Sequence, residues 1–294
     1  MINIKFTKIH GCGNDFILID GYNEDLKFSE NMLPELTKKM CDRHFGIGAD
    51  GVLLVLPPID KSTDFKMRIF NADGSEGEMC GNGLRCASKY FWERIKKTNN
   101  IEVETKAGIM NVVFNVKDNK IFSIAIDMGI PKFRRQEIPA LPEDDEFLLD
   151  LEVDLSDPGQ LHISAVNTGV PHTVVFVNDV NSVNVQKIGR ALRYYKLFPK
   201  GTNVDFVETV SDSHLKVRTY ERGVEGETIC CGTGATAAVA VGILLGKINK
   251  NNEIKVEFPG GTVYLLAKTV DEQLRSLIMT GTASKVFEGV YSPD

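Results

Sequence analysis

The sequence lacks a hydrophobic run long enough to cross a bilayer, and it has no excess of basic residues. Its longest nearly apolar stretch is Ala235–Leu245, well short of the about 20 residues that a transmembrane helix needs. Lys and Arg total 34 against 40 Asp and Glu, which gives a formal net charge of −6, whereas a nucleic-acid surface needs a basic face. The segment Met1–Lys8 alternates like a strand and has no signal-peptide block. We therefore expect a cytoplasmic protein that binds neither membranes nor nucleic acid.

Cysteine is scarce, with six residues in a chain of 294, too few for a disulfide framework. The six are Cys12, Cys41, Cys80, Cys86, Cys230 and Cys231. None forms a Cys-x-x-Cys pair and the histidines show no His-x-x-x-His spacing, so we expect no metal site. The stretch Gly46–Gly51 matches Gly-x-Gly-x-x-Gly, but it precedes a strand, which argues against a dinucleotide site. With no P-loop and no lysine marked for pyridoxal phosphate, we expect no cofactor.

Short strand-like segments dominate the sequence, and helices are few. The strand segments, of which Ile2–Thr7 is the first, are rich in Val, Ile, Phe and Thr and are bounded by turn-forming residues. Helices are predicted over Pro34–Arg43, Gly83–Lys97, Gln186–Tyr195 and Gly234–Gly246. The second of these is amphipathic, whereas the fourth is apolar all round and should be buried on every side. At roughly 150 residues per domain, the length indicates two domains.

The two halves of the chain repeat one motif, in which a strand ends in an acidic, Gly-containing loop followed by Cys-Gly-x-Gly and a helix. The two copies are Phe70-NADGSEGEMCGNG-Leu84 and Tyr220-ERGVEGETICCGTG-Ala235. The matched cysteines, Cys80 and Cys231, lie about half the chain length apart. This repetition indicates an internal duplication, with two similar domains related by a pseudo-two-fold axis.

We place the first domain at residues 1–131 and the second at 132–277. The segment Pro131–Asp157 is rich in Pro and acidic residues, which is typical of a connection. We therefore expect this segment to form the crossing between the domains.

A thiol at a strand-to-helix turn meets unpaired backbone N–H groups and the positive end of the helix dipole. Both should favour the thiolate and lower the cysteine pKa, and the same N–H groups suit a carboxylate. Two such turns from facing domains would place a base and an acid on opposite sides of one carbon, as inversion at an amino-acid α-carbon requires. We predict Cys80 and Cys231 as this pair. Cys230 is the alternative thiol, but Cys231 directly precedes Gly-x-Gly and matches Cys80.

At these residues the sequence resembles diaminopimelate epimerase, a cofactor-independent enzyme of lysine biosynthesis that uses two cysteines. The matching stretches are Phe6-TKIHGCGNDF-Ile17, Arg43-HFGIGADG-Val52, Asn71-ADGSEGEMCGNGLRC-Ala87, Phe198-PKGTNVDFVE-Thr209 and Tyr220-ERGVEGETICCGTGATAAVAV-Gly242. The resemblance implies interconversion of LL- and meso-2,6-diaminopimelate, in lysine and cell-wall precursor biosynthesis, by a thiolate/thiol mechanism. For the LL substrate, Cys80 would accept the proton and Cys231 would donate one.

The resemblance also implies a set of residues around the substrate. Substrate-binding roles fall on Asn14, Asn71, Gly81, Asn82, Asn203, Glu221, Arg222, Gly232 and Thr233, and a role in tuning the cysteine pKa values falls on His172 and Glu221. Arg222 would hold the distal carboxylate with its planar fork and Glu221 the distal ammonium. The sequence departs from many family members at Gly51, where they have Gln, and at Val170, where they have Asn.

The fold that the resemblance implies is α+β, with two similar domains, each a curled mixed sheet around a central helix. A C-terminal segment, about 278–294, would return to complete the first domain. The resemblance further implies a homodimer that acts on a small diamino diacid.

Two alternatives stay open. Proline or hydroxyproline racemase shares the fold superfamily and the two cysteines, although the set Asn203, Glu221 and Arg222 favours a longer diacid; phenazine-biosynthesis relatives lack the cysteine pair. The second alternative is an inactive homologue that only binds a small amino acid. It predicts ligand affinity without α-proton exchange in deuterated water.

Overall fold

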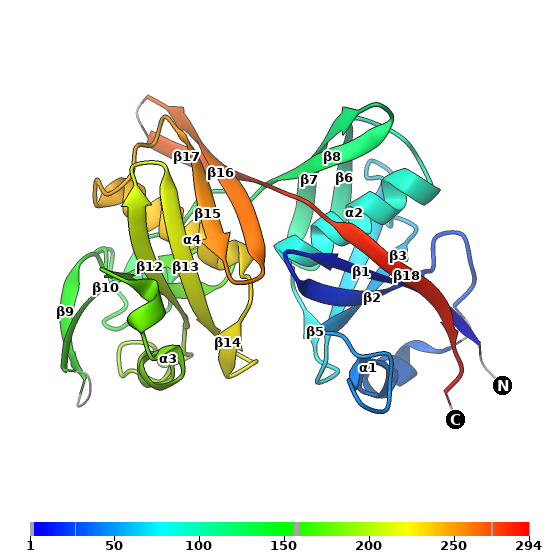
Figure 1. Ribbon diagram of the computed structural model, residues 1–294, viewed down its shortest axis with the longest axis horizontal. Helices are drawn as coiled ribbons and strands as arrows, with labels where there is room; N and C mark the ends of the chain where they lie inside the picture. Colours follow the sequence, from blue (N-terminus) through cyan, green and yellow to red (C-terminus); the bar gives the residue numbers. More distant parts are fainter. Residues whose placement is uncertain (1–2, 27, 156–158, 272, 294) are drawn as a thin grey trace. The chain divides into compact units, whose positions relative to one another are not determined.

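The computed structural model describes residues 3–26, 28–155, 159–271 and 273–293. Ile2 and Asp157, at the ends of two segments discussed above, lie outside the described residues. The chain divides into two compact units, whose strands and helices are labelled in Figure 1. Unit 1 comprises Met1–Ile126 and Thr280–Asp294, and unit 2 comprises Asp127–Met279. In the described ranges, no helix has the length and apolar character needed to span a membrane.

Unit 1 is built on a mixed sheet. Its strands are β1 (Ile4–Gly11), β2 (Asn14–Asp20), β3 (Gly51–Leu56), β4 (Phe65–Asn71), β5 (Glu76–Gly77), β6 (Asn100–Thr105), β7 (Gly108–Lys117), β8 (Lys120–Asp127) and β18 (Ser284–Tyr291), and its helices are η1 (Glu30–Met32), α1 (Leu33–Cys41) and α2 (Gly81–Arg94). The strands pair in the order β18–β1–β2–β3–β4–β6–β7–β8, with β5 also on β4. The pairs β2/β3 and β4/β6 are parallel, and the others are antiparallel.

Unit 2 is built in the same way. Its strands are β9 (Leu151–Leu155), β10 (Gly159–Asn167), β11 (Pro171–Val177), β12 (Asn203–Ser211), β13 (His214–Glu221), β14 (Gly226–Thr228), β15 (Glu253–Phe258), β16 (Gly261–Val270) and β17 (Gln273–Gly281), and its helices are η2 (Arg135–Glu137), η3 (Val180–Ser182), α3 (Val185–Arg193) and α4 (Gly232–Leu244). The order is β9–β10–β11–β12–β13–β15–β16, with β14 on β13. The parallel pairs are β11/β12 and β13/β15.

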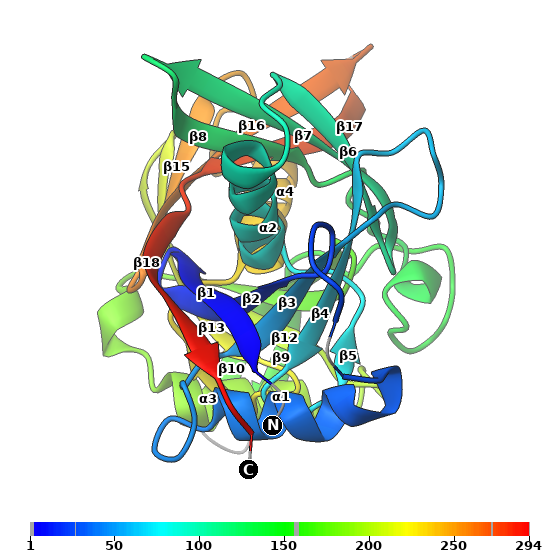
Figure 2. The same ribbon diagram turned by 90° about the vertical axis from the view of Figure 1, so that its right-hand side faces the viewer.

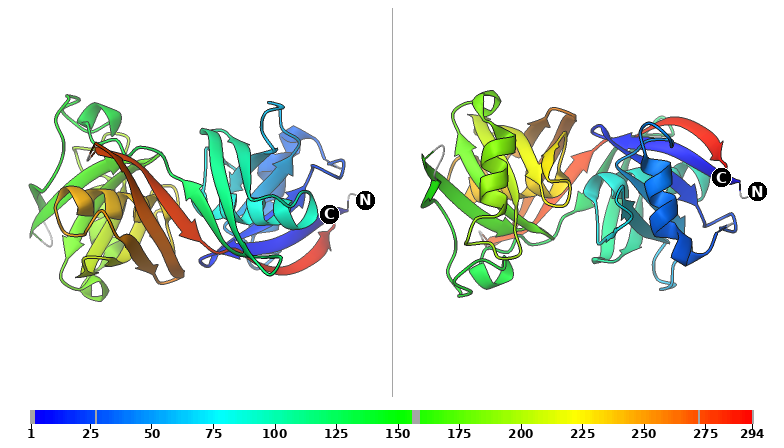
Figure 3. Two further views of the ribbon diagram at one scale, coloured as in Figure 1. Left: turned by 90° about the horizontal axis from the view of Figure 1, so that it is seen from above. Right: turned by 90° about the horizontal axis from the view of Figure 1, so that it is seen from below.

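The two units repeat one succession of elements. The series β1, β2, α1, β3, β4, β5, α2, β6, β7 recurs as β10, β11, α3, β12, β13, β14, α4, β15, β16, and the parallel pairs fall at equivalent places. The outer helices α1 (blue) and α3 (green) each cover the outside of their own sheet (Figure 3). The repeated Cys-Gly-x-Gly motif therefore marks a repeat of the whole α+β unit.

The sheet of unit 1 curls around one central helix, α2 (Figure 2), and the sheet of unit 2 packs in the same way on α4. Helix α2 packs on β1–β4, and α4 packs on β10–β13 and β16. Helix α4 is made mostly of Ala, Val and Gly and is buried from its first turn through Gly242, which confirms the predicted all-round burial for this part. The prediction is wrong for the end of the helix, where Leu244 is 44% exposed. Helix α2 is amphipathic as predicted, since it buries Leu84 and Phe91 while Lys89 and Glu93 form an ion pair of 2.6 Å on its outer side.

The expected crossing segment is a structural part of unit 2, so that prediction is wrong. Its apolar residues Ile138, Leu148 and Val153 are buried in the core of this unit. Strand β9 lies in the same segment and pairs with β10. The Pro-rich, acidic composition hid these alternating apolar positions, which contact the sheet instead of solvent.

Candidate active site

The two motif cysteines are the N-cap residues of the two central helices. Cys80 precedes α2 and its Sγ accepts the backbone N–H of Gly83 at 3.4 Å; Cys231 precedes α4 and accepts the N–H of Gly234 at 3.4 Å. Both cysteines have extended backbone dihedrals, with φ of −142° and −126°, as N-cap residues normally do. The helices begin two residues before the predicted starts because these thiols take the capping position.

In unit 1, the Cys80 thiol faces two asparagine side chains. It donates to Asn14 Oδ1 at 3.7 Å, and Asn82 Nδ2 approaches the same oxygen at 3.4 Å. Asn14 Nδ2 in turn donates to Asp50 Oδ2 at 2.7 Å, which fixes the orientation of the Asn14 amide. The structure thus brings together three of the predicted site residues, Asn14, Cys80 and Asn82, around the N-terminus of α2.

A fully buried arginine, Arg85, supports this cluster, and the sequence reasoning missed it. Its Nη2 donates to Asn82 Oδ1 and contacts Cys12 Sγ at 3.8 Å, while Nε donates to the Thr282 carbonyl at 3.4 Å. Because the Asn82 oxygen accepts from Arg85, the Asn82 nitrogen must point toward Asn14. Helix periodicity places Arg85 off the face of Leu84 and Phe91, which predicts an exposed side chain, and its complete burial corrects that prediction.

In unit 2, Cys231 is buried and contacts the hydroxyl of Thr233, with an Sγ–Oγ1 distance of 3.4 Å. Thr233 Oγ1 also lies 2.9 Å from Nε2 of His172. Asn203 Nδ2 approaches the same ring nitrogen at 3.3 Å. Four predicted site residues therefore meet at the N-terminus of α4.

The second ring nitrogen of His172 contacts Asp205, a residue that the sequence reasoning did not select. His172 Nδ1 and Asp205 Oδ2 are 2.6 Å apart, and both side chains are fully buried. Thr219 donates to the second carboxylate oxygen at 2.7 Å. Asp205 sits inside the apolar stretch of β12, and this polar interruption was the available signal.

Burial raises the pKa of the Cys231 thiol well above its ordinary value. The negative charges of Glu221 and Asp205 raise this pKa further. The hydrogen bond with Thr233 and the one with the Gly234 N–H act in the opposite direction. The expectation of a lowered pKa is thus wrong for Cys231, because desolvation of the thiolate outweighs the helix N-terminus.

The remaining predicted residues lie at the ends of strands. Asn71 ends β4, is exposed and donates to Ser75 Oγ at 3.0 Å. Glu221 ends β13, and the next residue, Arg222, donates its backbone N–H to Asn203 Oδ1 at 2.8 Å. The Arg222 guanidinium contacts the carbonyls of residues 200 and 201 at 3.3 and 3.5 Å.

Gly81 and Gly232 are the buried first residues of α2 and α4. At Gly51, a Cβ on this backbone would lie 2.5 Å from the carbonyl oxygen of Phe70, so a side chain there would require a local shift. Val170 lies in the turn between β10 and β11.

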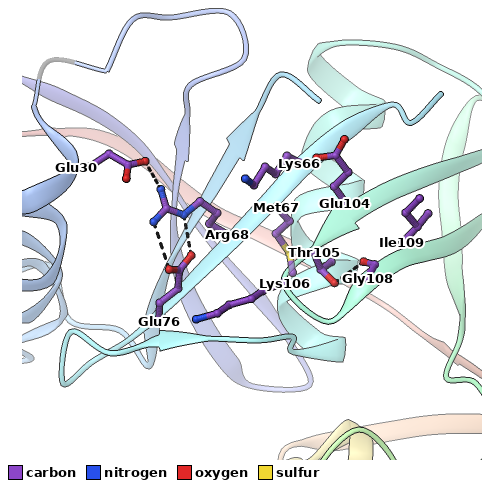
Figure 4. Close-up of a pocket in the computed structure, with 10 residues that line it drawn as sticks. All are labelled: Glu30, Lys66, Met67, Arg68, Glu76, Glu104, Thr105, Lys106, Gly108 and Ile109. Atoms are coloured by element: carbon purple, nitrogen blue, oxygen red, sulfur yellow. Dashed lines mark hydrogen bonds and ion pairs between the residues drawn. The ribbon is translucent and has the colours of Figure 1, made fainter. Parts of the chain in front are cut away.

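Unit 1 has a surface cavity of about 480 Å³ (Figure 4), and Cys80 is not among the residues that line it. It is lined by strands β4 to β7 and by residues of both charges. Its central cation, Arg68, contacts Glu76 at 2.7 Å and Glu30 at 2.5 Å. The lining as a whole carries three acidic side chains (Glu30, Glu76 and Glu104) and three basic ones (Lys66, Arg68 and Lys106), so it offers no net positive charge to an anion.

The other cysteines are packed in the interior. Cys12, Cys41, Cys86 and Cys230 are all buried. Burial raises the pKa of Cys41 to about 12 and raises that of Cys86 as well, so both stay protonated thiols at neutral pH.

Known proteins are similar to this chain over nearly its whole length. Residues 6–134 and 164–286 match the family described as diaminopimelate epimerase. The diaminopimelate epimerase of Methanocella arvoryzae is 44% identical over 306 residues, covering 100% of this chain and 99% of that protein. That of Gloeothece citriformis is 41% identical over 295 residues, covering 99% of each.

Among solved structures, a hydroxyproline epimerase from Agrobacterium vitis with bound trans-4-hydroxy-L-proline has a TM-score of 0.70 at 16% identity. The likeness covers 98% of this chain and 91% of that one, and it shows the fold.

Proposed function

Because the chain belongs to the diaminopimelate epimerase family, we propose that it interconverts LL- and meso-2,6-diaminopimelate without pyridoxal phosphate. The observation that carries this proposal is that each of the two repeated units presents a cysteine as the N-cap of its buried central helix. Inversion at an α-carbon needs one group that removes a proton and another that returns one to the opposite face. A duplicated unit supplies two such groups in one chain.

We assign these two roles to Cys80 and Cys231. With LL-diaminopimelate, Cys80 takes the α-proton as a thiolate while Cys231 gives its thiol proton to the other face, and the roles exchange in reverse. The raised pKa of Cys231 keeps that thiol protonated and ready to donate. The N–H groups at the starts of α2 and α4 stabilise the α-carboxylate as the carbanion-like state forms.

The polar residues beside the thiols would bind the rest of the substrate. The amides of Asn14, Asn71, Asn82 and Asn203 already make the hydrogen bonds described above, and their remaining N–H groups and lone pairs would bind the substrate without adding charge. Arg222 would hold the distal carboxylate and Glu221 the distal ammonium. Gly81, Gly232 and Thr233 complete the set around the α-carboxylate.

We further propose that two chains associate as a homodimer. Strand β18 leaves Val286, Phe287 and Val290 about half exposed, and a run of apolar side chains on an edge strand favours pairing with another copy. Analytical ultracentrifugation of the wild type and of Val290→Lys tests this, since the charged variant should shift toward monomer. Acid–base thiols work only while reduced, so we place the enzyme in the cytoplasm.

The decisive experiment measures conversion of LL- to meso-diaminopimelate by the purified chain and by Cys80→Ser and Cys231→Ser. Both variants should lose turnover by at least about 10³-fold, because each removes one of the two proton-transfer groups. Cys230→Ser is the matched control and should keep most activity. Loss of activity in Cys230→Ser with retention in Cys231→Ser would move the acid–base role to Cys230.

Two substrate controls separate the alternatives. Conversion of L-proline or 4-hydroxyproline in preference to diaminopimelate would contradict the assigned substrate. Binding of diaminopimelate without α-proton exchange in deuterated water would identify an inactive binding protein.

A further inference from the structure

Buried polar groups of unit 2 form one continuous hydrogen-bonded chain that ends at Cys231. Asp205 Oδ2 lies 2.6 Å from His172 Nδ1, His172 Nε2 lies 2.9 Å from Thr233 Oγ1, and Thr233 Oγ1 lies 3.4 Å from Cys231 Sγ. The His172 and Asp205 side chains are both 0% exposed. The link between His172 and Asp205 therefore operates without competition from bulk water, where hydrogen bonds are strong and their loss is costly, and the two links through Thr233 are partly buried.

The neighbouring amide of Asn203 determines which nitrogen of the His172 ring carries the proton. Asn203 Oδ1 accepts the backbone N–H of Arg222 at 2.8 Å, so its Nδ2 is the atom that faces His172 Nε2 at 3.3 Å. An amide nitrogen can only donate, which makes Nε2 an acceptor and leaves the ring proton on Nδ1. That Nδ1–H then donates to Asp205.

The direction of the remaining bonds follows from this tautomer. With Nε2 as an acceptor, the Thr233 hydroxyl donates to His172, and its oxygen accepts from the Cys231 S–H. The second oxygen of Asp205 accepts from Thr219 at 2.7 Å, which holds the carboxylate in place. His172 Nε2 has a single lone pair, and the shorter contact, with Thr233 Oγ1 at 2.9 Å, uses it, while the Asn203 amide lies beside it at 3.3 Å.

We propose that Asp205 is a positioning residue that lets His172 take and return the proton of Cys231 through the Thr233 hydroxyl. In the forward step the S–H bond breaks as its proton passes to Thr233 Oγ1, and the Thr233 hydroxyl proton passes to His172 Nε2. The products are a Cys231 thiolate and an imidazolium whose charge the Asp205 carboxylate balances. The reverse step restores the thiol. This role rests on the proposed function, in which Cys231 must alternate between the two forms.

A simpler role for Asp205, as a buried strand anchor, makes the opposite prediction. Its negative charge by itself raises the pKa of Cys231, as does the charge of Glu221 on β13. Neutralising Asp205 would then lower this pKa. If Asp205 instead stabilises the His172 imidazolium, neutralising it removes the destination of the proton, and the thiolate becomes harder to form.

The test is the pH dependence of Cys231 alkylation by iodoacetamide in Asp205→Asn. Fragment-ion mass spectrometry distinguishes alkylation of Cys231 from alkylation of Cys230, and the midpoint of the rate-against-pH profile gives the pKa of the Cys231 thiol. We expect the midpoint to rise by about one pH unit or more, with kcat for diaminopimelate about 10²-fold lower and KM unchanged. Asp212→Asn is the matched control, because it removes the same charge from the exposed β12–β13 turn and should leave the midpoint unchanged. A midpoint that falls or stays constant in Asp205→Asn overturns the proposal.

A second measurement uses the wild-type protein and does not depend on the folding of any site variant. The ¹⁵N shifts of the His172 ring, assigned by replacing the other four of the five histidines one at a time, should show a neutral ring protonated at Nδ1. A ring protonated only at Nε2 overturns the proposal. The alkylation profile and the ¹⁵N shifts need no substrate, and only kcat and KM do, so a chain that fails to epimerise diaminopimelate would refute the proposed function while the chemistry of Asp205 is still decided.

Discussion

Substitution of Gly234 by Ala should destabilise unit 2, although alanine is the better helix former. A Cβ at Gly234 would lie 2.4 Å from Asp205 Oδ1, far inside van der Waals contact. The carboxylate has little freedom to retreat, because it is held by His172 at 2.6 Å and by Thr219 at 2.7 Å. A shift of roughly 1 Å would break the hydrogen-bond geometry on both sides.

The magnitude follows from these contacts. Hydrogen bonds to a charged group contribute about 1.5–3 kcal/mol each, and both bonds of Asp205 would be weakened. The gain in helix propensity from Gly to Ala is only about 1 kcal/mol. We therefore expect Gly234→Ala to lower the free energy of unfolding by about 2–4 kcal/mol, a large share of the stability of a typical domain.

Urea unfolding followed by circular dichroism measures this loss. The matched control is Gly83→Ala at the equivalent position of α2, where the nearest atom to a Cβ is the Leu53 methyl Cδ2 at 3.0 Å. A methyl group can rotate away, so this variant should lose much less stability. If Gly234→Ala were as stable as Gly83→Ala, the Asp205 carboxylate would not be held as described.

Three further predictions concern other parts of the chain. Burial opposes the ionisation of Asp15, but hydrogen bonds from Arg43 and Lys8 lower its pKa overall. The Asp15 carboxylate therefore stabilises the folded state at pH values above its unfolded pKa of about 3.9, and this stabilisation is lost as the pH falls through the folded pKa. Arg43→Met should accordingly lower the urea midpoint at pH 7 and have little effect at pH 2, and equal losses at both would refute this. Arg222→Ala should raise KM for diaminopimelate about 10-fold or more with a smaller change in kcat, and an unchanged KM would remove Arg222 from the site. Phe91→Ala should lower the free energy of unfolding in urea by about 3–5 kcal/mol, because it removes a buried ring that stacks on Phe65 with centroids 4.8 Å apart. A loss below 1 kcal/mol would contradict that packing.

The fold could be predicted largely from two local signals. The repeated Cys-Gly-x-Gly motif gives the duplication, and the all-apolar stretch after Gly234 gives a helix buried on every side. Both signals are short-range, so they can be read without knowing which strands pair. The segment 131–157 was misread because composition does not reveal which few apolar residues, such as Ile138 and Leu148, are buried.

The site was less accessible to sequence reasoning. The cysteines and asparagines stand out by motif, but the partners of His172 depend on the parallel register of β11 and β12, which sets His172 opposite Asn203 and Val174 opposite Asp205. These residues are about thirty positions apart in the sequence. The pKa of Cys231 was also beyond sequence reasoning, because it depends on burial and on charges from β12 and β13.

The sulfur atoms of Cys80 and Cys231 each belong both to the proposed chemistry and to the first turn of a helix. A reagent that modifies such a sulfur atom also removes the acceptor of the N-cap hydrogen bond. We therefore expect loss of activity to be accompanied by fraying of the first turn of that helix. Serine supplies an oxygen in the same place and is a strong N-cap, whereas alanine supplies none. A serine replacement thus removes the acid–base thiol and keeps the N-cap hydrogen bond. The difference in unfolding free energy between a serine and an alanine variant measures that hydrogen bond alone.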